Sequence, residues 1–223
     1  MNVSYLRNEL ERRLGAKVPE IEEVTESITS EINRLKKVIG DYLRFSRVHR
    51  PMPKPCLLEE IVQDFVLFIS KEARERQIEI KSEIAPLGRP LWVDENLIRQ
   101  ALLNIVRNSF EAMPEGGQLE ISLRPRGNFA ELRIADNGPG IPAEQLPRVF
   151  DPFFTTKPEG TGLGLAQTRK IIRDHEGEIL CQSESNCGTT FLIRLPLQKA
   201  VSPEVEPQPE ISKVEESSYA YKK

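Results

Sequence analysis

The sequence predicts an α/β protein in which an antiparallel helical hairpin precedes one mixed domain. Over the first ~50 residues, apolar side chains recur every three or four positions, which is the period of an amphipathic helix. After a proline-rich break, helical patterns alternate with short runs of period two that are typical of strands. Such alternation within one chain favours an α/β architecture.

The hairpin is predicted over residues 1–50. Each helix has an apolar face, formed by Val3, Leu6, Leu10 and Leu14 in the first and by Ile21, Val24, Ile28, Ile32, Leu35, Ile39, Tyr42 and Phe45 in the second. Helices over about residues 2–14 and 20–47 would be roughly 20 and 42 Å long. The second helix therefore extends beyond the first, and its apolar face packs in a core or against a second subunit.

The mixed domain is predicted over residues 57–197, after a stiff proline-rich linker at 51–56. Its helices are expected at 57–76, 94–113 and 163–175, and its strands at 77–84, 90–93, 117–123, 129–135, 178–183 and 189–195. Asp94 is the predicted N-cap of the second of these helices. Residues 198–223 contain five glutamates, three prolines and few apolar residues, so we expect a disordered tail.

Composition excludes several functional classes. With 31 Lys+Arg against 34 Asp+Glu, the net charge of −3 argues against a broadly basic nucleic-acid-binding protein. No apolar run approaches the roughly 20 residues of a membrane-spanning helix. Three cysteines and two histidines, without CxxC spacing, exclude a dense disulfide framework and disfavour a zinc site. We therefore expect a soluble protein of a reducing compartment.

Two segments of the mixed domain carry side chains suited to binding a cation or an amine. Asn104 and Asn108 are spaced i, i+4 and therefore lie on one helical face, where an amide oxygen can coordinate a hard cation. The alternative is that the two side chains cap backbone groups or face solvent. Asp136 ends a strand, and Gly138 and Gly140 after it allow close backbone approach. An ordinary Asp-Asn-Gly turn is the alternative interpretation of this second segment.

A third segment is suited to phosphate. Phe-Asp-Pro-Phe-Phe-Thr-Thr-Lys at 150–157 precedes Gly-Thr-Gly-Leu-Gly-Leu at 160–165, which opens a predicted helix. Glycines before a helix N-terminus expose backbone N–H groups, and Lys157 adds a positive charge. The spacing is neither the GxGxxG dinucleotide fingerprint nor the GxxxxGK[ST] P-loop, and a hinge is the alternative.

In order and spacing, these segments resemble the N, G1, F and G2 boxes of the ATP-binding catalytic domain of two-component histidine kinases. The resemblance covers residues 57–197, extends to the closing Gly-Thr-Thr-Phe-Leu-Ile-Arg-Leu-Pro at 188–196, and is greatest with the NtrB/NtrY group. It implies the GHKL (Bergerat) ATP-binding fold, a two-layer α/β sandwich with helices on one face of a mixed sheet and a lid over the nucleotide. The hairpin resembles the dimerisation domain of these kinases, which implies a homodimer.

The resemblance also implies which residues form the ATP site. Phosphoryl transfer would involve Asn104, Asn108 and Lys157, with Mg²⁺ on Asn108. The phosphates would contact Lys157 and, largely through backbone, Gly160, Thr161, Gly162, Leu163 and Gly164. The adenine ring of ATP or ADP would lie against Asp136, Gly138, Gly140 and Thr190, with Phe153 and Phe154 in the lid.

The phosphoacceptor histidine of this family, usually in a His-Glu-x-x-Asn-Pro setting on the first dimerisation helix, is absent from the sequence. His49 and His175 have other neighbours, and we expect structural or solvent roles for both. The sequence therefore predicts the catalytic region of an ATP-dependent protein-histidine kinase, which transfers the γ-phosphate to a histidine for relay to the receiver domain of a response regulator. The simplest account is a chain cut downstream of the acceptor box and unable to autophosphorylate.

Two other functions stay open. A nucleotide-binding dimer without enzymatic activity could regulate a kinase or a response regulator. A GHKL-type ATPase, similar to gyrase, MutL or a heat-shock chaperone, is disfavoured because Asn104 stands where those enzymes place a glutamate base. The implied location is the cytoplasm, either as a free protein or as the cytosolic part of a membrane-bound sensor.

Overall fold

The computed structural model describes residue 12 and residues 19–46, 51–157 and 160–197 of the chain. The second helix of the predicted hairpin is present as α2 (Pro19–Ser46), and it begins with a proline, whose fixed φ suits the first turn of a helix. The predicted helix at 2–14, apart from Arg12, and the predicted tail at 198–223 lie outside the described residues.

The apolar face of α2 is exposed. Its described members are 37–58% exposed; they are Val24, Ile28, Ile32, Leu35, Ile39 and Leu43. The spacing of three or four residues keeps them on one side of the helix. Among the described residues, no helix combines the length and the apolar character needed to cross a bilayer.

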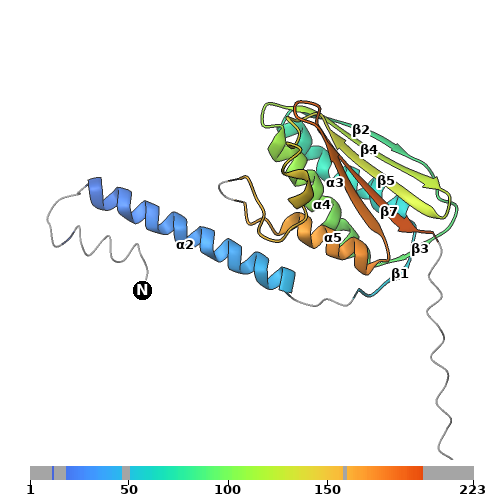
Figure 1. The fold of residues 1–223 in the computed structure, drawn as a ribbon, viewed down its shortest axis with the longest axis horizontal. Helices are drawn as coiled ribbons and strands as arrows, with labels where there is room; N and C mark the ends of the chain where they lie inside the picture. The colour runs from blue at the N-terminus through green and yellow to red at the C-terminus, as the bar shows by residue number, and fades with distance from the viewer. Residues whose placement is uncertain (1–11, 13–18, 47–50, 158–159, 198–223) are drawn as a thin grey trace, which may run out of the picture.

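The mixed domain contains a five-stranded sheet in the order β2-β4-β5-β7-β6. Its strands are β2 (Ile78–Ile84), β4 (Gly117–Arg126), β5 (Phe129–Asp136), β6 (Glu178–Ser183) and β7 (Thr189–Pro196). Strands β2 and β4 run parallel, and the other neighbours run antiparallel. The helices α3 (Leu58–Glu75), α4 (Glu95–Ala112) and α5 (Gly164–Asp174) lie on one face of this sheet (Figure 1). The architecture is the expected two-layer α/β sandwich.

The end of the segment expected to be a linker is a strand instead. Strand β1 (Lys54–Cys56) pairs antiparallel with β3 (Leu91–Val93), with Pro55 opposite Trp92. Proline has no N–H to donate, but a two-stranded ribbon leaves every strand at an edge, where such a residue is tolerated. Residues 54–56 therefore belong to the mixed domain.

The core lies between the sheet and α4. Alternate residues of β4 (Leu119, Ile121 and Leu123) and of β5 (Leu132 and Ile134) are almost completely buried. They are joined by core residues from α4, namely Ile98, Ala101, Leu102, Ile105, Val106 and Phe110. Helix α4 is therefore held against the sheet along its whole length, which fixes the polar side chains that it carries.

Asp94 and His175 fix the start of α4. The Asp94 carboxylate accepts hydrogen bonds from the backbone N–H of Asn96 at 3.1 Å and of Leu97 at 3.3 Å, so it is the N-cap that the sequence predicts. His175 is buried, its Nε2 accepts from the backbone N–H of Asp94 at 2.9 Å, and its Nδ1 lies 2.7 Å from the carbonyl of Ile171. This arrangement assigns the proton to Nδ1 and gives His175 the structural role that we expected. His49 lies outside the described residues.

Candidate functional site

The Asp136 carboxylate lies at the end of β5 and is held by three donors. Ser109 Oγ on α4 donates to Oδ2 at 2.8 Å, and the backbone N–H groups of Gly138 and Thr189 donate to Oδ1 at 3.1 and 3.2 Å. Two carboxylate oxygens offer about four acceptor positions, so one position on Oδ2 is left for a ligand N–H. Asp136 is 8% exposed, so this remaining acceptor is both fixed in direction and largely desolvated.

Of the two threonines in strand β7, the structure brings Thr189 rather than Thr190 to Asp136. Thr189 is directly opposite Asp136 in the β5–β7 pair, whereas Thr190 is opposite Ala135. Side chains alternate between the two faces of a sheet, so Thr190 points to the face away from the helices, where Arg133 donates to its hydroxyl at 3.5 Å. The hydroxyl of Thr189 instead lies 3.0 Å from that of Ser183.

Helix α4 also presents the two predicted asparagines. Asn104 Nδ2 donates to the carbonyl of Gly164 at 3.1 Å and lies 3.5 Å from Thr168 Oγ1, so Asn104 fixes the first turn of α5. Asn108, one turn later, accepts a hydrogen bond on Oδ1 from Lys157 Nζ at 3.0 Å. The same ammonium forms an ion pair with Glu111 Oε2.

Residues 150–157 and 160–163 precede α5 and carry the predicted lid and phosphate-binding segments. The Phe153 N–H donates to the carbonyl of Gly162 at 2.9 Å, and Phe153 has a positive φ of 66°. Gly162 also has φ 66°, and a Cβ there would overlap the backbone of Phe153, so this close approach requires glycine. Leu163 caps α5 without a side-chain hydrogen bond, which leaves the first backbone N–H groups of this 11-residue helix available to an anion.

Phe153 and Phe154, both expected in a lid, lie differently. Phe153 is 55% exposed. Phe154 is half-buried, and the guanidinium of Arg148 lies 4.6 Å from its ring centroid. A cation over an aromatic face is attractive, so Arg148 helps to hold the loop at Phe154.

Two of the three cysteines, Cys56 and Cys181, lie in surroundings that disfavour the thiolate. Burial, followed by the charge of Asp136, raises the pKa of the Cys181 thiol to about 12. Burial, followed by the charge of Glu95, raises the pKa of Cys56 above its ordinary value. The thiolate is the nucleophilic form of cysteine, and both side chains are therefore inert at neutral pH.

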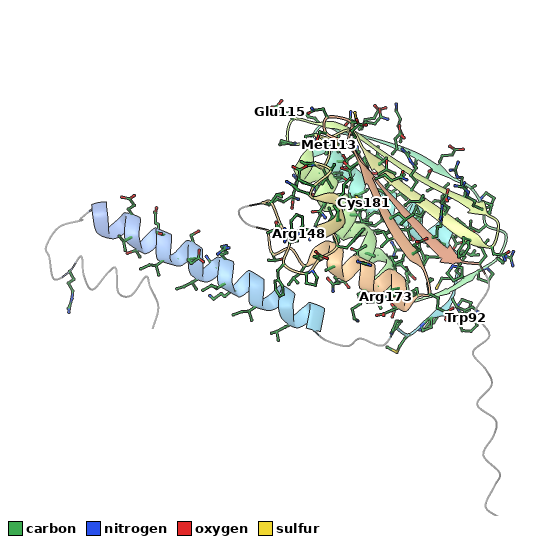
Figure 2. The ribbon with its side chains drawn as sticks, viewed as in Figure 1. Trp92, Met113, Glu115, Arg148, Arg173 and Cys181 are labelled. Carbon is green, nitrogen blue, oxygen red and sulfur yellow. The ribbon has the colours of Figure 1, made fainter. Side chains whose placement is uncertain are left out.

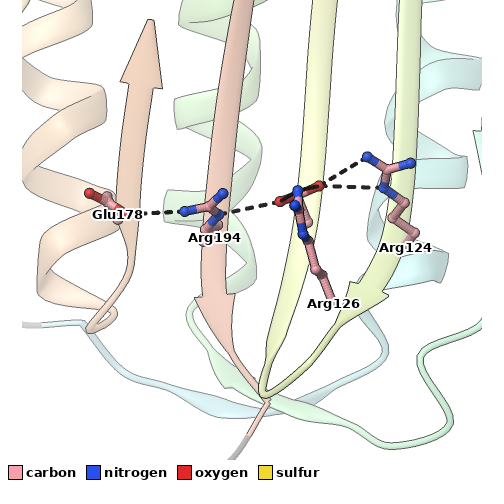
Figure 3. Close-up of polar contacts among 5 residues, drawn as sticks. Arg124, Arg126, Glu178 and Arg194 are labelled. Carbon is pink, nitrogen blue, oxygen red and sulfur yellow. Dashed lines mark hydrogen bonds and ion pairs between the residues drawn. The ribbon is translucent and has the colours of Figure 1, made fainter.

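The other end of the sheet carries a row of alternating charges. Arg124, Glu131, Arg194 and Glu178 are directly opposite one another on β4, β5, β7 and β6 (Figure 3). Burial by itself would raise the pKa of the Glu131 carboxyl, but hydrogen bonds from Arg124, Arg194 and Arg126 outweigh it and hold that pKa below its ordinary value.

A cavity of about 500 Å³ opens beside this row. It is lined by Arg126, Phe129, Glu176, Gly177, Glu178 and Arg194. Phe129 begins β5 and Asp136 ends it, so the cavity is separated from Asp136 by the length of the strand. It is therefore not part of the site at Asp136.

Comparisons with known proteins show the family to which the chain belongs. Residues 93–199 match the family model described as histidine kinase-, DNA gyrase B- and HSP90-like ATPase. The crystallised catalytic domain of histidine kinase ThkA is 32% identical, with a TM-score of 0.59 over 65% of this chain and 95% of that one. This chain belongs to the sensor histidine kinases. It carries their ATP-binding catalytic domain, as the motifs at 104–165 indicate.

Full-length relatives of this histidine kinase chain show similar identity. Sporulation kinase C of Bacillus subtilis (strain 168) is 33% identical over 81% of the chain, and the sensory histidine kinase/phosphatase NtrB of Rhizobium meliloti (strain 1021) is 33% identical over 82%. The chain spans 42% and 52% of the lengths of these two proteins. A structure of ThkA in complex with response regulator protein TrrA is 26% identical, with a TM-score of 0.66 over 88% of this chain and 58% of that one.

Sequence reasoning missed three side chains of the site: Ser109, Glu111 and Thr189. Ser109 is a polar residue on the buried face of α4, next to the core residue Phe110, and that position was the available signal. Thr189 shares the alternation of the apolar residues Phe191 and Ile193, which places it on the core face of β7. Glu111 carries no comparable signal, because its partner is in a loop 46 residues away.

Proposed function

We propose that this chain binds ATP or ADP together with Mg²⁺ and supplies the phosphoryl donor of a protein-histidine kinase. The observation that carries the proposal is the Asp136 carboxylate, which is fixed by donors from α4, β7 and the loop at Gly138 and keeps one acceptor position. An exocyclic amino group is the natural ligand for an oriented carboxylate oxygen.

The adenine end of the nucleotide would be recognised at β5 and β7. Asp136 would accept from the amino group, and Gly138 and Gly140 would let the base approach the backbone. Thr189 replaces Thr190 as the supporting threonine, because it is the one that shares the face of Asp136. Its hydroxyl is already linked to Ser183, which suits it to orient a bound water.

The phosphate end would lie between α4 and α5. Asn108 would hold Mg²⁺ through its amide oxygen, and the metal would neutralise charge on the phosphates. Backbone N–H groups of residues 160–164 and the Lys157 ammonium would contact the phosphates. Asn104 would position the start of α5, since its amide nitrogen already binds Gly164. In phosphoryl transfer such groups act by positioning and by charge stabilisation.

Calorimetry with Mg·ADP tests this assignment. We expect about micromolar affinity, which Asp136→Asn weakens by about 10-fold or more, because hydrogen bonds to a charged group contribute about 1.5–3 kcal/mol. Asn108→Ala should weaken binding with Mg²⁺ and have less effect in EDTA. Asp64→Asn, an exposed carboxylate on α3 that pairs with Arg99, is the matched control. Unchanged affinity in both site variants would refute the site.

We further propose that this chain does not phosphorylate itself. His175 has both ring nitrogens engaged by backbone groups of Asp94 and Ile171, and it is buried. With [γ-³²P]ATP we expect no acid-labile label on this chain, and transfer only to a separate chain that supplies an acceptor histidine. Label mapped to His49 would contradict this proposal. Binding without transfer to any such chain would favour the non-enzymatic nucleotide-binding dimer.

Two protein partners and a cellular location complete the proposed function. We propose that the exposed stripe of α2 forms a homodimer interface, because an uncovered apolar helix face of this length is stabilised by a second helix. The receiver domain of a response regulator is the proposed final phosphoryl acceptor.

We place the chain in the cytosol, where ATP is available and where its three unpaired cysteines stay reduced.

A further inference from the structure

Lys157 links the loop before α5 to two neighbouring side chains of α4. Its Nζ lies 3.0 Å from Asn108 Oδ1 and also forms an ion pair with Glu111 Oε2. Asn108 and Glu111 are three residues apart, so they lie on one face of the helix. The Lys157 and Glu111 side chains are 40% and 52% exposed, so both can move into solvent or toward a ligand.

This contact opposes a metal ion on Asn108. A Mg²⁺ ion lies about 2.0–2.1 Å from its oxygen ligands. An ammonium on the same oxygen would then lie within about 5 Å of a doubly charged cation, a distance at which partly screened charges still repel. Departure of the Lys157 ammonium from Asn108 Oδ1 therefore favours the binding of a metal there.

We propose that Glu111 is a positioning residue that retains Lys157 on Asn108 and so competes with the binding of Mg²⁺·nucleotide. The inference rests on the proposed function and adds a control element to the same site. Phosphate oxygens offer the ammonium the same kind of anionic partner as the Glu111 carboxylate. When nucleotide binds, Lys157 thus exchanges the Glu111 carboxylate for phosphate oxygens. Glu111 therefore lowers the nucleotide affinity by the free energy of one half-exposed ion pair.

The test is a double-mutant cycle on Mg·ADP affinity, measured by calorimetry. Glu111→Gln should tighten binding by about 1.4- to 5-fold, which is the range for exposed ion pairs. In a Lys157→Ala background the same Glu111→Gln change should have no effect, because the competing ammonium is gone. The gain should be larger with Mg²⁺ than in EDTA, since only the metal requires Asn108 Oδ1.

Glu115→Gln is the matched control. Glu115 is an exposed acidic residue one helical turn further along the chain, in the turn that follows α4 (Figure 2). Its substitution changes the net charge by the same amount, and we expect unchanged affinity. Equal tightening by Glu111→Gln in both backgrounds would overturn the proposal, because Glu111 would then repel the phosphates directly. Weaker or unchanged binding in Glu111→Gln would overturn it as well.

A second readout does not depend on nucleotide. Without added nucleotide, Glu111→Gln should accelerate amide hydrogen exchange of residues 153–157 several-fold, whereas Glu115→Gln should not. Unchanged exchange would overturn the retention of Lys157 by Glu111 even if nucleotide binds normally. If the unmodified chain binds no nucleotide but Glu111→Gln accelerates amide hydrogen exchange of residues 153–157, the proposed function is overturned. The contact between Lys157 and Glu111 is then still established.

Discussion

Replacing Glu131 by Gln tests how far one buried carboxylate stabilises the sheet. Glu131 is 1% exposed on the central strand β5, and it accepts hydrogen bonds from Arg124 and Arg126 on one side and from Arg194 on the other. The N–O distances of these bonds are 3.2–3.4 Å. Gln keeps one acceptor oxygen but points an NH₂ donor at guanidinium donors, so at least one arginine loses its partner.

The expected cost is about 2–3 kcal/mol of unfolding free energy at pH 7. Hydrogen bonds to charged groups contribute roughly 1.5–3 kcal/mol when the group is buried. The arginines are 31–64% exposed, so the released guanidiniums regain water and the cost stays below that of a fully buried ion pair. Urea unfolding followed by circular dichroism measures this difference. Mg·ADP affinity should be unaffected, because Glu131 lies far along β5 from Asp136.

The pH dependence gives the prediction a second, independent signature. The three arginines hold the pKa of Glu131 below its ordinary value, so its stabilisation is complete above about pH 4.3 and is lost as pH falls through the lowered pKa. The difference between unmodified protein and Glu131→Gln should therefore shrink below about pH 4. Glu120→Gln, which breaks a half-exposed pair with Arg133, is the control and should cost at most about 1 kcal/mol. Equal costs for the two variants, or a Glu131 effect independent of pH, would refute the reasoning.

Two further predictions concern the base site and the dimer. Thr189→Val should weaken Mg·ADP binding by about 3- to 10-fold, since it removes a hydroxyl that lies on the same face of the sheet as Asp136. Thr190→Val should leave the affinity unchanged, and calorimetry that gave the reverse order would restore Thr190 as the site residue. Ile32→Glu, which puts a charge in the centre of the α2 stripe, should convert a dimer to a monomer in light scattering, while Asn33→Glu should not. A monomer in the unmodified chain would refute the proposed interface.

The regular elements were predictable because each repeats one strong local signal. Strand β7 alternates buried and half-buried residues over its whole length, and Asp94 combines an N-cap with a following apolar helix. Strand β1 was missed because two of its three residues, Lys54 and Pro55, have low strand propensity, and only pairing with β3 makes it a strand.

The motifs predicted the segments that we propose as the site, but not the contacts between their side chains. Thr189 and Thr190 are adjacent residues of the same type, so the sequence does not distinguish them. Which of the two faces Asp136 depends on the pairing register of β7 with β5, and that register exists only in the folded sheet. The contact of Lys157 with Glu111 joins a loop to a helix across 46 residues, and no periodicity encodes such a pair. Local patterns therefore predict the segments of the proposed site, while the tertiary packing decides which of their side chains lie together.

Helix α4 joins the two ends of the proposed nucleotide site. Successive residues of a helix are rotated by about 100° and separated by 1.5 Å along the axis, so Asn108 and Ser109 face different neighbours at nearly the same height. Asn108 meets Lys157 on the loop side, and Ser109 meets Asp136 on the sheet side. A metal on Asn108 and a base on Asp136 would thus be positioned by adjacent residues of one rigid helix. A substitution that rotates or shifts α4 should therefore impair binding of base and metal together, whereas a change in the loop at Lys157 should act on the metal and the phosphates and spare the base.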